Sequence, residues 1–82
     1  MSSYAALHDY CRAQCIPLQR VEVSEGPLDQ PRWVVTVILF DINNPSSMTF
    51  VGGPAATKRA ARRIAATRAL QRLGQAIPEG TD

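Results

Sequence analysis

The segment from residue 57 to residue 74 constrains the fold more than any other part of this chain. At 3.6 residues per turn, five of its small and apolar side chains fall within an arc of roughly 140°. They are Ala65, Ala66, Ala69, Leu70 and Leu73. Thr57 can cap the helix at its start, and Gly74 is a suitable C-terminal stop. The segment therefore predicts a long helix whose alanines allow close packing on another layer.

Three strands and a first helix precede this segment. The spacing of apolar side chains predicts a helix over 3–14, capped by Ser2 or Ser3 and ended before Pro17. Strands are expected over 18–24, 33–40 and 48–51, the last ended by Gly52-Gly53-Pro54, with a loop over 25–31 and a turn over 41–47. Short connections favour antiparallel pairing. The predicted class is α+β, with order α-β-β-β-α and two helices packed on one face of a three-stranded antiparallel sheet.

Length and composition limit what such a chain can be. Its 82 residues suit one domain over 1–82, with an ordered part of about 3–75, and 45% hydrophobic residues argue against a disordered tail. No apolar run approaches the roughly 20 residues that cross a bilayer, so no membrane partner is expected. The N-terminus lacks a basic start and a long apolar stretch, so we expect an intracellular location, cytoplasmic or nuclear. Cys11 and Cys15 are then expected as reduced thiols.

Positive charge is concentrated in the last predicted helix. Six of the nine basic residues lie between Lys58 and Arg72, and no acid lies among them, although the net charge of the chain is only +2. Lys58 and Arg62 point in about the direction of the alanine stripe, one to two turns earlier. Because charged side chains are almost never buried unpaired, the helix start is expected to project beyond the sheet. The unpaired N–H groups there add to the field and indicate an anion site. The alternative is a solvated face that only improves solubility.

These residues resemble the double-stranded RNA-binding domain family. Residues 57–70 read T-K-R-A-A-R-R-I-A-A-T-R-A-L, which is similar to the family's second-helix pattern S-K-K-x-A-K-x-x-A-A-x-x-A-L. Leu7-His8-Asp9-Tyr10 resembles the first-helix pattern L-x-E-Y, and Glu25-Gly26-Pro27 matches the E-G-P of the first hairpin. Pro17, Trp33 and Phe50 stand at the family's post-helix proline and strand aromatics. The resemblance covers nearly the whole chain.

The resemblance implies a protein that reads A-form RNA by shape, largely without sequence specificity. Such domains span about 16 base pairs, contacting two minor grooves and the phosphates between them. By the resemblance, Lys58, Arg59 and Arg62 contact phosphates, and Asp9 accepts a hydrogen bond from 2′-hydroxyls. The remaining expected RNA-binding residues are His8, Arg12, Asp29, Arg32, Gly53 and Arg63.

Two positions depart from the family pattern. Asp29 stands where the family has a histidine that enters a minor groove, and an acid there repels phosphates. Arg32 is near enough in sequence to compensate in part. Ala55 replaces the second glycine of the glycine-rich loop before the last helix. The second helix and the first helix are therefore the stronger expected contacts.

Other chemistry finds little support in the residues. His8, Cys11 and Cys15 share helical spacing, but three ligands on one helix with no second cluster make a poor zinc site. We therefore expect no metal, no cofactor and no catalytic residue, and we do not interpret the chain as an enzyme.

The central predicted strand suggests an alternative function. Trp33, Val35, Val37 and Leu39 should face the helices, which leaves the other set on the opposite, solvent-facing side. That set includes Val34, Ile38 and Phe40. Large apolar groups on an open face favour a protein-interaction or homodimerisation module. The opposing hypothesis is that Arg20, Glu22 and Met48 cover them.

Overall fold

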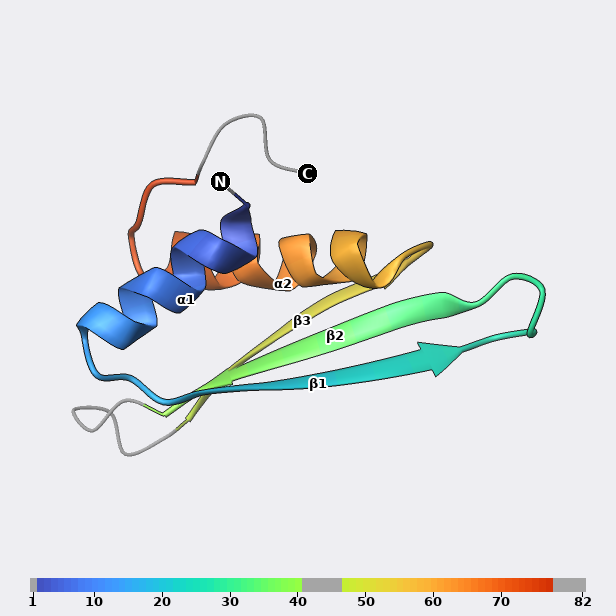
Figure 1. Ribbon diagram of the computed structural model, residues 1–82, viewed down its shortest axis with the longest axis horizontal. Helices are drawn as coiled ribbons and strands as arrows, with labels where there is room; N and C mark the ends of the chain where they lie inside the picture. The colour runs from blue at the N-terminus through green and yellow to red at the C-terminus, as the bar shows by residue number, and fades with distance from the viewer. Residues whose placement is uncertain (1, 41–46, 78–82) are drawn as a thin grey trace.

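The computed structural model describes residues 2–40 and 47–77. The elements follow the order α1 (Ser3–Ala13), β1 (Leu18–Glu25), β2 (Arg32–Leu39), β3 (Met48–Ala55) and α2 (Lys58–Arg72). Both helices lie on one face of the sheet (Figure 1). The predicted α-β-β-β-α arrangement is confirmed. Most of the turn expected over 41–47 lies outside the described residues.

Helix α1 begins at a side-chain cap and buries one face. Ser2 is the cap, because its Oγ accepts a hydrogen bond of 3.1 Å from the backbone N–H of Ala5. Leu7 and Cys11 are buried on the inner face, as the spacing predicted. Ser3 is buried as well, and its Oγ accepts a hydrogen bond of 3.3 Å from the hydroxyl of Thr67 on α2. This bond ties the first turn of α1 to the second helix.

The sheet has the order β1-β2-β3, and both pairs of strands are antiparallel. Strand β3 is longer than predicted: it continues through Gly52-Gly53-Pro54 to Ala55, so the expectation that these residues end the strand is wrong. Gly52 still pairs with Val35, and a bulge precedes the pairing of Ala55 with Trp33. The glycines therefore serve packing inside the strand rather than its termination.

The alanine stripe of α2 packs against β2 and β3, as the sequence predicts. Ala65, Ala66, Ala69 and Leu70 are buried together with Ala61, and they meet Val35, Val37 and Leu39 of the central strand. A Cβ on Gly52 would lie 2.2 Å from the carbonyl oxygen of Ala61 and 2.4 Å from the nitrogen of Ala65. Helix backbone and strand backbone are thus in direct contact at Gly52.

The strand expected over 18–24 forms as β1, and its pairing with β2 determines which of its side chains face the helices. Antiparallel register places Glu22 opposite Val35 and Arg20 opposite Val37, on the face that the helices cover. Val21 and Val23 face the other way, with 41% and 51% of their surface exposed. Strand β1 therefore offers charged groups to the helical layer and apolar groups to solvent.

We predict that Gly52→Ala is strongly destabilising, because its methyl group would overlap two backbone atoms that cannot rotate away. Overpacking of this kind costs about 2 kcal/mol or more of unfolding free energy, measurable by chemical denaturation. Gly74→Ala is the matched control, since no atom lies within 4 Å of its added methyl group. Its positive φ of 71° still makes alanine unfavourable there, by about 1 kcal/mol. Equal losses in the two variants would contradict the proposed close contact.

Candidate nucleic-acid interface

The N-terminus of α2 is a capped helix start rich in positive charge. Thr57 Oγ1 accepts a hydrogen bond of 3.1 Å from the N–H of Ala60, and no acid lies in the first turn. The ammonium group of Lys58 lies 4.7 Å from the ring centroid of Trp33, within the range of a cation–π interaction. Trp33 therefore holds the first basic side chain against the end of the sheet.

The sequence predicted that the start of α2 projects beyond the sheet, and this prediction is wrong. Neither Arg62 nor Lys58 stands free there. Figure 1 shows why: the β1–β2 hairpin extends past the start of α2, so the sheet continues beneath the first helical turns. Arg62 points down to that sheet, where its Nε lies 3.5 Å from Glu22 Oε2. Only 33% of its side chain is exposed. Arg62, which the family resemblance predicts to contact phosphate, therefore has an anionic partner inside the protein, Glu22.

Glu22 has a second arginine partner on its own strand. The Nε of Arg20 lies 3.5 Å from Glu22 Oε1, and the guanidinium carbon of Arg20 lies 5.2 Å from the ring centroid of Tyr4 on α1. One carboxylate thus separates two guanidinium groups between β1 and the helices. These contacts connect β1 to both α1 and α2.

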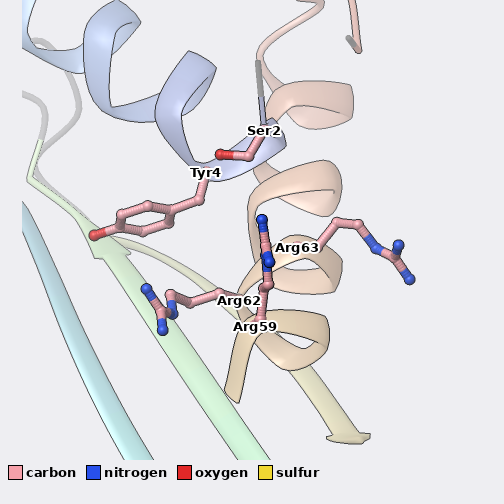
Figure 2. Close-up of a pocket in the computed structure, with 5 residues that line it drawn as sticks. All are labelled: Ser2, Tyr4, Arg59, Arg62 and Arg63. Carbon is pink, nitrogen blue, oxygen red and sulfur yellow. The ribbon is translucent and has the colours of Figure 1, made fainter. Parts of the chain in front are cut away.

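A pocket of about 200 Å³ lies between the two helices. Its lining residues are Ser2, Tyr4, Arg59, Arg62 and Arg63. In Figure 2, Arg59 extends toward Ser2, Arg62 extends below Tyr4 toward the sheet, and Arg63 points away from both. Guanidinium groups and hydroxyls are strong donors to phosphate oxygens, and the N-terminal N–H groups of α1 add the positive end of its dipole. This arrangement can hold an anion.

Helix α1 presents its other predicted residues to solvent. His8, Asp9 and Arg12 are all exposed. Asp9 and Arg12 form an exposed ion pair of 3.7 Å one turn apart, and the His8 ring lies 6.4 Å from that of Tyr4. The outer surface of α1 therefore continues from the rim of the pocket.

The β1–β2 loop lies at the same end of the molecule as the start of α2 (Figure 1). The N–H of Gln30 donates a 3.1 Å hydrogen bond to the carbonyl of Pro27, which closes a turn with Leu28 and Asp29 at its tip. Leu28 is fully exposed, and Asp29 and Arg32 are exposed as well. The tip thus carries an apolar side chain and an acid.

Gly53 has a packing role inside β3. A Cβ at this position would lie 2.4 Å from the carbonyl oxygen of Trp33, and its φ is 105°. The glycine lets β3 approach β2 closely beside the ring that supports Lys58. The contact of Gly53 with RNA stays a prediction.

The outer face of the sheet carries several exposed apolar side chains. Antiparallel register places Arg20, Glu22 and Met48 on the helix-facing side, so the opposing hypothesis that these side chains cover the outer face is wrong. Val21, Val23 and Val51 are exposed on the outer face, and Phe40 is 44% exposed at the end of β2. Val34 and Ile38 are half-buried among them.

The described part of the chain contains neither a cluster of metal ligands nor a membrane-spanning helix. Within residues 2–40 and 47–77, no group of three His, Cys, Asp or Glu side chains could hold a metal ion. Burial raises the pKa of the Cys11 thiol, which favours its neutral form. Among the helices described, none is long and apolar enough to cross a membrane.

Sequence reasoning missed four contributors to this site. Ser2 and Tyr4 line the pocket, and Arg20 and Glu22 form the ion cluster beneath it. The missing signal is the register of β1: once Glu22 is placed opposite the buried Val35, both charged residues must face the helices. Single-strand alternation does not contain that information.

Comparison with protein families gives a match over most of the chain. The model of the double-stranded RNA binding motif matches residues 3–73, which include both helices and all three strands. A comparison with curated proteins gives no match.

Proposed function

The chain belongs to the family of the double-stranded RNA binding motif, and from this premise we propose that it binds RNA duplexes by shape, largely without sequence specificity. The family is one of RNA-binding domains rather than of catalysts, which supports a binding role without a reaction. The binding surface in this proposal consists of the first turns of α2, the pocket beside them and the exposed surface of α1.

The single observation that carries the proposal is the pocket with three arginines between α1 and α2. A-form RNA presents rows of phosphates on either side of its narrow major groove. All three arginines line this pocket: Arg59 extends toward Ser2, Arg62 lies on the sheet side, and Arg63 points outward and adds positive charge at the rim. Lys58 extends the positive surface toward the hairpin. In the proposal, one strand of the duplex crosses this surface and places a phosphate at the pocket mouth.

Helix α1 supplies the minor-groove contact in the proposal. Asp9 is exposed and can accept a hydrogen bond from a 2′-hydroxyl, a group that DNA lacks. Arg12, 3.7 Å from Asp9, offsets the repulsion between this carboxylate and nearby phosphates. His8 and Arg12 are available to flank the same groove.

The β1–β2 loop makes the weakest contact in this proposal. Leu28 and Asp29 form its exposed tip and offer no cation to a phosphate, whereas Arg32 lies at the base of the hairpin. Affinity then rests on two contact regions, with Arg32 as the only charged donor described at the base of the third.

The proposal is tested by titrating the protein with duplex RNA, duplex DNA and single-stranded RNA of one length at two salt concentrations. We expect duplex RNA to bind at least about tenfold more tightly than duplex DNA, equivalent to about 1.4 kcal/mol. Changing the duplex sequence should have little effect. Equal affinity for both duplexes would reduce the interaction to nonspecific electrostatics.

The basic residues at the start of α2 should determine the salt dependence. In the triple variant Lys58→Ala, Arg59→Ala and Arg62→Ala, the slope of log affinity against log salt should fall by roughly 0.9 for each lost phosphate contact, a value calibrated on DNA. The fold should survive, because the contacts with Trp33 and Glu22 are partly exposed and contribute about 1 kcal/mol or less each.

Arg72→Ala is the control for this prediction. Arg72 is exposed in the last turn of α2, at the opposite end of the helix. Its removal should leave the slope nearly unchanged, whereas Arg59→Ala alone should lower it. If the triple variant binds duplex RNA as tightly as the parent, the proposed phosphate site is wrong.

A second candidate function is homodimerisation through the outer sheet face. The outer face carries, over its centre, Gln19, Val21, Val23, Val34, Thr36, Ile38, Thr49 and Val51. The two charged residues in this part of β1, Arg20 and Glu22, point to the helices instead. The centre of the outer face is therefore uncharged, with valines and Ile38 beside Thr36 and Thr49, whereas Glu25 and Arg32 lie on this face at the hairpin end. Such a patch can pack against its own copy under two-fold symmetry without bringing like charges together.

The dimer hypothesis predicts that Val21→Glu converts a dimer to a monomer in light scattering. Val21 is exposed near the middle of β1, so the charge should disturb the interface without disturbing the core. Phe40→Glu should act in the same direction. Gln71→Glu is the matched control, because Gln71 is exposed on α2, on the helical side of the sheet, and adds the same charge away from the proposed interface. A parent that is monomeric at high concentration would exclude this function.

A further inference from the structure

We propose that the Glu22 carboxylate is an internal competitor of RNA phosphate for Arg62, so that Glu22 sets the affinity and salt dependence of the site. The inference rests on the proposed function and adds a residue that opposes binding. Glu22 would act through Arg62 and would not itself contact RNA.

The geometry places Glu22 where it can compete. Its Oε2 lies 3.5 Å from Arg62 Nε, and Arg62 also lines the pocket between the helices. Only 23% of the Glu22 side chain is exposed, so the carboxylate attracts Arg62 from a partly desolvated position on the sheet. Arg62 therefore lies between two anion positions, the carboxylate below it and the pocket beside it.

The ion pair is close but not hydrogen-bonded. Among the described residues, neither Glu22 Oε2 nor Arg62 Nε has a hydrogen-bond partner, although both atoms are buried. Well-formed arginine–carboxylate pairs gain much of their strength from aligned, often bidentate hydrogen bonds, which this pair lacks. A phosphate that offers such bonds can therefore draw Arg62 away.

Arg20 remains a partner of the Glu22 carboxylate when Arg62 moves to a phosphate. Its Nε lies 3.5 Å from the other oxygen of Glu22, and its guanidinium stays over the Tyr4 ring. Breaking a buried pair is costly mainly when one charge is left uncompensated. Because Arg20 remains, Glu22 can release Arg62 to a phosphate at a smaller cost.

The first test compares Glu22→Gln with Glu25→Gln in duplex RNA titrations. Both substitutions remove one negative charge from β1, but only Glu22 contacts Arg62. Glu22→Gln should tighten binding about threefold at low salt and steepen the salt dependence, in keeping with the modest strength of partly exposed ion pairs. Glu25→Gln should have a smaller effect.

The second test repeats this comparison in a protein that carries Arg62→Gln. In that background the gain from Glu22→Gln should disappear, while any effect of Glu25→Gln should persist. A gain of equal size with and without Arg62 would overturn the inference, because Glu22 would then act on RNA only through its general field. Unchanged or weaker binding by Glu22→Gln in the parent background would also overturn it.

An arm without RNA separates this inference from the proposed function. Inorganic pyrophosphate is titrated into the protein while the Nε–Hε resonance of Arg62 is followed by NMR. The resonance should shift in the parent and should reach its endpoint at a lower concentration in Glu22→Gln. The same response in both proteins would refute the competition. If the competition is seen but the parent binds no duplex RNA, the proposed function fails and the phosphate site remains.

Discussion

The backbone contact at Gly52 is the constraint on which the rest of the molecule depends. A side chain there would meet the carbonyl of Ala61 and the nitrogen of Ala65, so α2 can reach the sheet only because both surfaces are small. Once the helix lies this close to β3, the buried alanines cover the central strand with few large side chains. The small core of the chain therefore depends on close approach rather than on bulk.

The same approach explains where the positive charge lies. With α2 close to the sheet, the side chains one to two turns before the alanine stripe reach the sheet beneath them. Lys58 meets Trp33, and Arg62 meets Glu22. The positions of these basic side chains are thus a consequence of packing. The close approach of α2 directs Arg62 toward the sheet, whereas Arg59 extends toward the start of α1. The pocket forms where these directions diverge.

The fold could be predicted from the sequence because its signals are local and strong. The alanine stripe, the cap at Thr57 and the apolar alternation of β2 each determine an element by themselves. The phase of β1 could not be predicted, because an edge strand with valines alternating against arginine and glutamate fits either orientation. Only pairing with β2 decides it. Likewise, Gly52-Gly53-Pro54 reads as a strand end unless the approaching helix is known.

Binding of RNA and self-association need not exclude each other in this molecule. The pocket and the exposed surface of α1 lie on the helical side of the sheet, whereas Val21, Val23 and Val51 lie on the opposite side. A dimer formed through the outer face would leave both helical layers open and directed away from each other. Two sites joined in this way would gain avidity only on RNA that reaches both. The length of duplex at which affinity rises would then report the geometry of the dimer, whereas a monomer would show a gradual dependence on the number of available sites.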